Sequence, residues 1–403
     1  FLRLNSWVDL RHGVDDQAGL ALLRSITIAH PPGALARTRS DQVQDELCPY
    51  RGLQVFREED APFFFGREQF TQRLATAVAG APLVAVVGAS GSGKSSVVRA
   101  GLLPLLRAGF DASQWDILTL LPGERPLQAL ATALLSKLEP DLGEIDRLIE
   151  IEKLAGHLLE GRISLRHVGQ RVLEKQPGTD RLLLVVDQWE ELYSLCTDPA
   201  AREAFVEQLL NARQDERFKA VLTLRGDFFA RPLANRALAD ALERGQVNLG
   251  PMTAEELTRA IESPASSLGL HFAPGLVDRV LDDVGSEPGN LPLLEFVLAS
   301  LWERRRGSAL QFEAYEAIGG VKGALAARAD TIFEHELSAD EQQAARHVLL
   351  RLVRPGAGTG DTRKRLSIAL EDEPALAVIG RLANARLIVT SRGAGGMVAE
   401  LTH

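Results

Sequence analysis

The stretch Leu83-Val-Ala-Val-Val-Gly88-Ala-Ser-Gly-Ser-Gly93-Lys94-Ser95 decides the fold of this chain. Its first five residues are apolar and predict a buried strand, and residues 96–107 that follow it have the character of a helix. A glycine turn between a strand and a helix N-terminus gathers backbone N–H groups at the positive end of the helix dipole. The glycines let the backbone approach a phosphate without a Cβ in the way. The stretch therefore predicts a phosphate-binding loop, and a flexible glycine turn is the alternative.

This loop also predicts which groups contact a nucleotide. Lys94 is expected to reach the β- and γ-phosphates, and the hydroxyl of Ser95 is expected to ligate Mg²⁺. The residues expected to bind ATP or ADP here are Gly88, Ala89, Ser90, Gly91, Ser92, Gly93, Lys94, Ser95 and Ser96.

A second apolar run, 181–186, ends in acidic residues. Asp187 follows it directly and is expected to hold Mg²⁺ together with Ser95. Glu190 or Glu191 is expected to position the attacking water, and the spacing leaves open which of them does so. Acidic residues are also favoured where a strand runs into a helix N-terminus, which is the structural alternative.

A third run, 218–224, ends at Arg225, two residues before Asp227. Arg225 is expected to sense the γ-phosphate through a bidentate contact, and an ion pair with Asp227 is the alternative. Pro292 lies at a predicted helix start, where it is either a helix-initiating residue or a ring that packs against adenine.

Length and composition limit the number of domains, the partners and the compartment that can be expected. With 403 residues, the chain is expected to form two to four domains. A net charge of −9 gives no electrostatic reason to bind nucleic acid or anionic lipid, so neither partner is expected. No apolar stretch reaches the length of a membrane span. Cys48 and Cys196 lack metal-ligand spacing and indicate a reducing compartment, which predicts a cytoplasmic protein.

The alternation of elements predicts the architecture. Apolar strands are expected at 83–87, 115–121, 181–186, 218–224 and 246–249, with helical periodicity between them. This order is typical of a parallel sheet covered by helices on both faces. Helices are expected afterwards at 253–263, 275–284, 291–304, 311–317 and 321–353, the first of them opened by the capping box Thr253-Ala-Glu-Glu256. A hairpin from 385–390 and 397–402 then suggests a winged helix. The expected fold class is an α/β P-loop NTPase followed by a helical domain and a winged-helix domain.

Taken in order, five motifs resemble those of a STAND NTPase, the class that contains NACHT and apoptosome-type ATPases. They are Phe65-Gly-Arg-Glu68, the loop 88–95, Asp187-Gln-Trp-Glu-Glu191, Thr223-Leu-Arg225 and Gly289-Asn-Leu-Pro292. The resemblance is closest to the bacterial subgroup often fused to WD-repeat propellers. Residues 1–32 are similar to the last strand and helix of a TIR domain, and the chain is expected to be an internal piece of a longer protein. The implied division is a TIR end (1–32), a linker (33–47), an NTPase domain (48–250), a helical domain (251–345) and a winged-helix domain (346–403).

The resemblance implies an ATP- and ADP-controlled signalling switch in bacterial immune defence or stress signalling. It implies slow ATP hydrolysis, self-association on activation, a trigger sensed by a missing C-terminal module, and control of an upstream TIR effector with NAD-cleaving activity. Phe65, Gly66 and Arg67 would close one side of the base opposite Pro292, and His403 would touch the β-phosphate of ADP, although the usual Met-His-Asp triplet is absent. An AAA+ remodelling ATPase and a scaffold with structural nucleotide are the alternatives.

Overall fold

The computed structural model describes residues 47–285, 290–354, 362–363, 366–368, 373–384, 387–393 and 396–401. The chain divides into two units, Phe1–Leu47 and Cys48–His403, and the elements below belong to the second. The predicted TIR-like segment 1–32, the linker apart from Leu47, and His403 lie outside the described residues.

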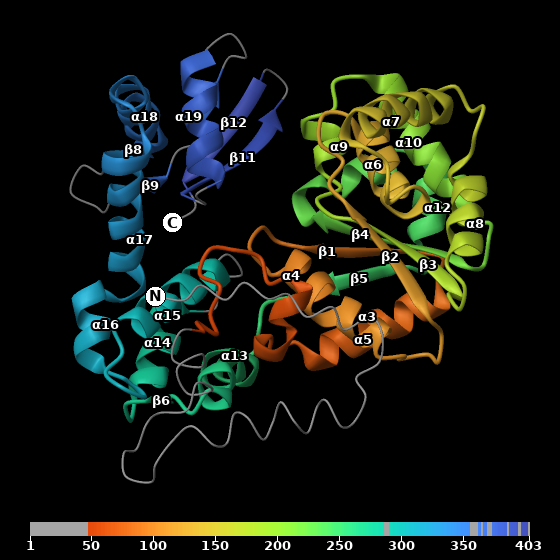
Figure 1. The fold of residues 1–403 in the computed structure, drawn as a ribbon. Helices are drawn as coiled ribbons and strands as arrows, with labels where there is room; N and C mark the ends of the chain where they lie inside the picture. The colour runs from red at the N-terminus through yellow and green to blue at the C-terminus, as the bar shows by residue number, and fades with distance from the viewer. Residues whose placement is uncertain are drawn as a thin grey trace, which may run out of the picture. The chain divides into compact units, whose positions relative to one another are not determined.

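A parallel sheet of five strands lies at the centre of residues 48–250 (Figure 1). Its strands stand in the order β2-β3-β4-β1-β5, and every neighbouring pair is parallel. Each expected strand is present, as β1 (Leu83–Gly88), β2 (Trp115–Leu120), β3 (Arg181–Val186), β4 (Phe218–Arg225) and β5 (Gln246–Leu249). Because the strands are parallel, the carboxyl ends of β1, β3 and β4 meet at one edge of the sheet.

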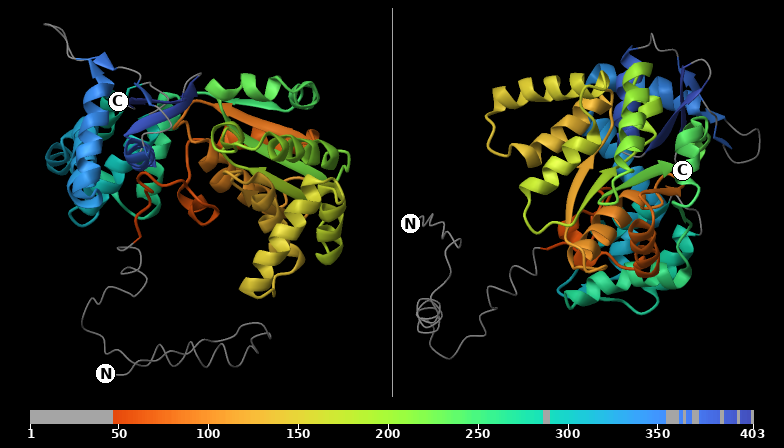
Figure 2. Two further views of the ribbon diagram at one scale, coloured as in Figure 1. Left: turned by 90° about the horizontal axis from the view of Figure 1, so that it is seen from above. Right: turned by 90° about the vertical axis from the view of Figure 1, so that its right-hand side faces the viewer.

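Helices cover both faces of this sheet (Figures 1 and 2). Alternate residues of β1 enter two different cores: Leu83 and Ala85 pack with one helical layer, and Val84 and Val86 pack with the other. The first layer contains α6 (Pro126–Leu138), α7 (Glu144–Leu159), α8 (Leu165–Lys175), α9 (Glu191–Ser194), α10 (Pro199–Ala212) and α12 (Arg236–Leu242). The second contains α3 (Glu68–Gly80), α4 (Lys94–Ser96) and α5 (Leu103–Arg107). The predicted α/β fold with a parallel sheet is therefore confirmed.

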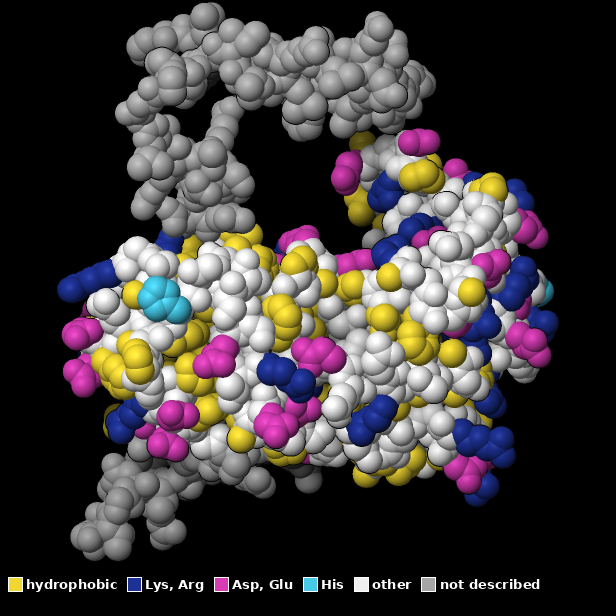
Figure 3. All heavy atoms as spheres, turned by 90° about the horizontal axis from the view of Figure 1, so that it is seen from below, with side chains coloured by type: hydrophobic (Ala, Val, Ile, Leu, Met, Phe, Trp, Pro, Cys, Tyr) yellow, Lys and Arg dark blue, Asp and Glu magenta, His cyan; other side chains and the backbone are white. Residues whose placement is uncertain are grey.

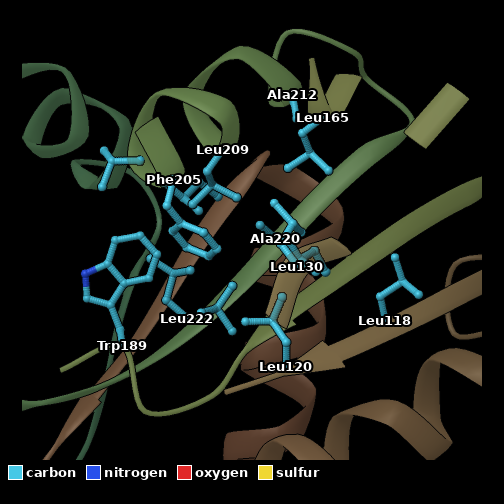
Figure 4. Close-up of a cluster of buried hydrophobic side chains, with 14 of the residues drawn as sticks. Leu118, Leu120, Leu130, Leu165, Trp189, Phe205, Leu209, Ala212, Ala220 and Leu222 are labelled. Carbon is cyan, nitrogen blue, oxygen red and sulfur yellow. The ribbon is translucent and has the colours of Figure 1, made fainter. Parts of the chain in front are cut away.

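Trp189 anchors the end of β3 in the first core (Figure 4). Its ring is fully buried and packs against Phe205 of α10, with 5.9 Å between the ring centroids. The backbone N–H of Trp189 also donates to the carbonyl of Thr223 on β4. This packing fixes the backbone on the C-terminal side of Asp187.

The helix after the glycine loop is less regular than expected. A π-helical turn, Val97–Leu102, separates α4 from α5. At this turn the helix passes close to α3, because a Cβ built on Gly101 would lie 2.6 Å from the Thr71 hydroxyl oxygen. A side chain at position 101 would therefore force Thr71 to move.

A second group of helices follows β5. It contains α13 (Ala254–Ser267), α14 (Leu276–Val284), α15 (Leu291–Glu303), α16 (Phe312–Ile318) and α17 (Gly320–Thr331). The predicted capping box opens α13: Glu256 N–H donates to the Thr253 hydroxyl at 3.2 Å, and Thr253 N–H donates to the Glu256 carboxylate at 2.9 Å. A short parallel pair that the sequence did not predict, β6 (His271–Phe272) and β7 (Ala309–Leu310), lies at its edge.

The single helix predicted over 321–353 is wrong. After α17 the chain forms a π-helical turn, Ile332–Glu336, and a new helix, α18 (Ala339–Leu352), begins after Ser338. The reason is a second capping box, in which Glu341 N–H donates to the Ser338 hydroxyl and Ser338 N–H donates to the Glu341 carboxylate.

The C-terminal elements are small. They are β8 (Val353–Arg354), β9 (Thr362–Arg363), β10 (Leu366–Ile368), α19 (Glu373–Asn384), β11 (Ile388–Gly393) and β12 (Gly396–Leu401). The expected hairpin is present as the antiparallel pair β11 and β12, and β10 pairs with the other edge of β12. None of the described helices combines the length and apolar character needed to cross a membrane.

Candidate nucleotide-binding site

The glycine loop lies between β1 and α4, at the carboxyl edge of the sheet. Gly91 and Gly93 have φ angles of 73° and 89°, in the left-handed region that favours glycine. A Cβ on Gly88 would lie 2.8 Å from the carbonyl oxygen of Leu249. Ala89 and Ser90 at the tip of the loop are exposed. The three glycines are thus required by the backbone itself, and the loop has the shape that the sequence predicts.

Lys94 is buried and turned toward the loop. Its Nζ donates to the carbonyl oxygens of Gly88 at 3.1 Å and Ala89 at 2.7 Å. Burial lowers the pKa of Lys94 to about 8, and the nearby carboxylate of Glu190 partly opposes this shift. The ammonium group is therefore held at the place where the loop backbone turns.

Asp187 is the point where three elements converge. The hydroxyls of Ser95 and Thr223 both donate to its Oδ1, at 2.7 and 2.6 Å. Its Oδ2 accepts from Nη2 of Arg99 at 2.9 Å. Asp187 is only 1% exposed. The glycine-loop helix, β3 and β4 are joined here through one carboxylate.

Arg99 was not predicted as a site residue. It lies four residues after Ser95, so the two side chains share one side of the helical run, and that spacing was the available signal.

The two glutamates after β3 point to different partners. Glu190 is 9% exposed, and its Oε2 accepts the backbone N–H of Arg225 at 3.3 Å. Glu191 Oε2 accepts the N–H of Gly123, in the segment after β2, at 3.0 Å. Burial raises the pKa of both carboxyl groups. Glu190 therefore faces β4 and Lys94, and Glu191 is held against the neighbouring loop.

Arg225 makes the ion pair that the sequence offered as the alternative to a phosphate sensor. Its Nε and Nη2 contact the two carboxylate oxygens of Asp227, at 3.1 and 2.7 Å. Its guanidinium also lies 5.4 Å from the centre of the Phe228 ring.

The residues expected around the base lie at the junction between the sheet and the second helical group. A Cβ on Gly66, whose φ is 85°, would lie 2.3 Å from the carbonyl oxygen of Glu256. Arg67 donates to the carbonyl of Gly250 at 2.8 Å and pairs with the Glu256 carboxylate at 3.5 Å. Phe65 is half-buried. This segment is fastened to the start of α13.

Pro292 lies in the first turn of α15, as predicted. That turn is next to the glycine loop, because a Cβ on Gly93 would lie 4.0 Å from Cδ1 of Leu291. The start of α15 and the phosphate-binding loop are therefore neighbours.

The sequence did not predict that residues 50–56 form a strap between the glycine-loop helix and the second helical group. Phe56 N–H donates to the hydroxyl of Ser96 at 3.3 Å, Arg51 N–H donates to Glu295 of α15 at 3.1 Å, and the Tyr50 hydroxyl donates to the carbonyl of Ile261 in α13 at 2.6 Å. Burial raises the pKa of Glu295 to about 8. The strap connects the glycine-loop helix with two helices of the second group.

The sheet order, the glycine loop and the buried aspartate define a P-loop NTPase. The sequence model of the family described as Novel STAND NTPase 1 matches residues 49–403, and the chain belongs to this family. The predicted STAND class is thereby confirmed. No curated protein matches the sequence.

One solved structure of low identity shares the fold. The ORC1 protein of Aeropyrum pernix, solved in complex with DNA, is 16% identical, with 88% of this chain and 94% of that chain covered at a TM-score of 0.53. A Walker-type ATPase of Pyrococcus abyssi is also 16% identical, with coverage of 86% and 95%, at a TM-score of 0.44. Only the first likeness is close enough to support an argument, and it concerns the fold alone.

The expectation that nucleic acid is not a partner gains no support from this comparison, since the ORC1 structure is a DNA complex. On the face shown in Figure 3, Lys and Arg side chains are interspersed with Asp and Glu side chains.

Proposed function

We propose that this chain is a STAND switch that binds ATP and ADP, hydrolyses ATP slowly and self-associates when activated. The observation that carries the proposal is the convergence on Asp187, whose Oδ1 accepts from Ser95 of the glycine-loop helix and Thr223 of β4. A phosphate-binding loop and a metal-binding carboxylate must lie this close to act on one nucleotide.

The residues fit a magnesium ion. Mg²⁺ prefers oxygen ligands and keeps several waters, so one carboxylate and one hydroxyl beside the phosphates are a suitable set. Ser95 and Asp187 would hold the ion, and the ion would neutralise charge on the phosphates. Lys94 would contact the β- and γ-phosphates, and the loop from Gly88 to Ser96 would donate its backbone N–H groups.

Glu190 is the residue that we assign to orient the attacking water. Its carboxylate is tied to the end of β4 beside Lys94, where a γ-phosphate would lie. Glu191 is instead held by the N–H of Gly123, away from that position. Glu191 therefore supports the loop after β2.

Arg225 distinguishes ATP from ADP in this proposal. It would exchange its contact with Asp227 for the γ-phosphate, which ADP lacks. A hydrogen bond to a charged group contributes about 1.5–3 kcal/mol. Moving a two-state equilibrium from almost fully closed to almost fully open requires about 5.5 kcal/mol. The Arg225 contact alone is too weak, so Lys94, the metal ion and an activating partner would supply the remainder.

The base would lie between the segment Phe65, Gly66 and Arg67 and the ring of Pro292. The segment is fastened to α13, and Pro292 starts α15, whose first turn borders Gly93. A bound nucleotide would therefore contact the second helical group directly through its base.

The proposal extends to the whole protein. The NTPase domain (48–250) would be followed by a helical domain (251–345) and a winged-helix domain (346–403) that closes over ADP, with His403 at the β-phosphate. Upstream, a TIR effector that cleaves NAD would be controlled by assembly. A C-terminal WD-repeat module would sense the trigger of a cytoplasmic bacterial defence or stress response.

Size-exclusion chromatography with ADP and then with a non-hydrolysable ATP analogue tests this function. A change from monomer to oligomer on exchange supports the switch. A permanent ring with rapid ATP turnover would instead identify a remodelling ATPase of the AAA+ kind. A protein whose assembly ignores both nucleotides would be a scaffold.

A further inference from the structure

One buried carboxylate in this site contacts both a hydroxyl of the glycine-loop helix and a guanidinium. Nη2 of Arg99 lies 2.9 Å from Oδ2 of Asp187, while Ser95 donates to Oδ1 of the same group. The Asp187 side chain is 2% exposed and that of Arg99 is 29% exposed. The π-helical turn Val97–Leu102 carries Arg99, and such turns recur at functional sites.

A buried carboxylate needs a positive partner, because an unpaired charge inside a protein is strongly unfavourable. Within the described part of the chain, Arg99 is the one side chain that forms an ion pair with Asp187. Lys94 lies near but donates to the carbonyls of Gly88 and Ala89. Arg99 therefore neutralises Asp187 in this arrangement.

The guanidinium of Arg99 makes a single contact with Asp187 and not a bidentate one. Its Nε is buried without a hydrogen-bond partner among the described residues, and its side chain has one hydrogen-bond acceptor there, Asp187. An arginine fixed as a structural support would be expected to use its planar fork with two acceptors. A divalent ion beside Ser95 and Asp187 would bring two positive charges to the same carboxylate and would repel the guanidinium.

We propose that Arg99 is a built-in competitor of the divalent metal at Asp187. This inference rests on the proposed nucleotide-binding function and adds to it a control on metal loading. Without metal, Arg99 keeps the carboxylate neutralised and occupied. When a metal and nucleotide enter together, Arg99 releases Asp187 and turns toward solvent, so the position of Arg99 sets the metal concentration at which the site is loaded.

The test is a Mg²⁺ titration of fluorescent ATP-analogue binding to the intact chain, comparing wild type with Arg99→Gln. We expect Arg99→Gln to lower the Mg²⁺ concentration for half-maximal binding by about tenfold, because one repelling and competing charge is removed. Arg107→Gln is the matched control. Arg107 belongs to the same helical run and pairs with Glu58 at the surface. The Mg²⁺ midpoint of Arg107→Gln should therefore stay at the wild-type value.

Arg99→Lys keeps the test decisive if the glutamine variant does not fold. A lysine keeps the charge but lacks the fork, so its Mg²⁺ midpoint should fall between those of wild type and Arg99→Gln. Thermal melting gives a second readout. Without metal, the melting temperature of Arg99→Gln should be below that of wild type. Adding Mg²⁺ with nucleotide should reduce this difference in melting temperature.

An unchanged or higher Mg²⁺ midpoint in the variants would overturn the inference and make Arg99 a positioning residue for Asp187. That result is separate from failure of the proposed function. If wild type itself bound no nucleotide, the function and the inference would both be wrong. If wild type bound nucleotide without regard to Mg²⁺, only the inference would be wrong.

Discussion

The carboxylate of Glu190 accepts the backbone N–H of Arg225, with 3.3 Å between Oε2 and N, so the segment after β3 is joined to the end of β4. The bond holds a buried acid at the edge of the sheet that carries the glycine loop. The bond uses only the backbone of Arg225, whose side chain pairs with Asp227. An acid and a guanidinium are thereby presented to the same region.

Exchanging Glu190 for Gln should stop turnover while nucleotide stays bound. The amide keeps the shape and one acceptor but cannot orient and deprotonate water, so hydrolysis should fall by about 10²–10⁴-fold. Phosphate release and nucleotide affinity measured side by side check this. Glu191→Gln is the matched control and should retain most of the activity, since Glu191 is bonded to Gly123. A Glu190→Gln protein that releases phosphate at the wild-type rate would exclude this assignment.

Nucleotide affinity should fall as the pH rises above 8. The pKa of Lys94 is lowered to about 8 by burial, so the free protein loses this positive charge at higher pH, while bound phosphates favour the charged form. Binding at pH 9 should therefore take up a proton, which calorimetry in buffers of different ionisation enthalpy measures. In Lys94→Arg the charge persists, and any binding that remains should lose this pH dependence. Equal proton uptake in both proteins would point to another group.

Removing the guanidinium of Arg225 should weaken ATP binding and leave ADP binding unchanged. Loss of one charge-assisted hydrogen bond corresponds to about 10–100-fold in affinity for a non-hydrolysable ATP analogue. Asp227→Asn should raise the affinity for the ATP analogue, because it removes the ion pair between Asp227 and Arg225. Equal losses for both nucleotides in Arg225→Gln would show that Arg225 does not read the γ-phosphate.

The junction between β5 and α13 should depend on the ion pair between Arg67 and Glu256. Arg67 is 5% exposed, so Arg67→Gln leaves the half-buried Glu256 carboxylate without its ion-pair partner and should destabilise the fold by about 2 kcal/mol. Arg259→Gln removes an exposed pair with Glu68 from the same region and should cost at most about 1 kcal/mol. Thermal melting compares the stability of the two variants. Similar losses of stability would mean that the Arg67 pair contributes no more than an exposed ion pair.

Much of this architecture follows from local patterns. The five apolar runs predict the five strands, because strands buried on both faces are apolar throughout. The glycine loop and Asp187 were predictable for a related reason, since parallel strands bring their carboxyl ends together.

Other features depend on contacts that the sequence does not display. The strap formed by residues 50–56 depends on Glu295 and Ile261, which are more than 200 residues away in the chain. The choice between Glu190 and Glu191 depends on which loop each one meets in space. The break in the helix predicted over 321–353 had a visible signal, Ser338-Ala-Asp-Glu341, which is a capping box inside a periodic stretch.

The most direct test of the account is calorimetry of nucleotide binding to Lys94→Ala beside wild type. The alanine side chain of Lys94→Ala cannot reach a phosphate. Lys153→Ala removes an exposed lysine of α7 and therefore controls for the loss of one positive charge. We predict that wild type and Lys153→Ala bind ADP and ATP in the presence of Mg²⁺ and that Lys94→Ala binds neither. Wild-type affinity for ADP in a folded Lys94→Ala protein would contradict the assignment of the phosphate-binding loop.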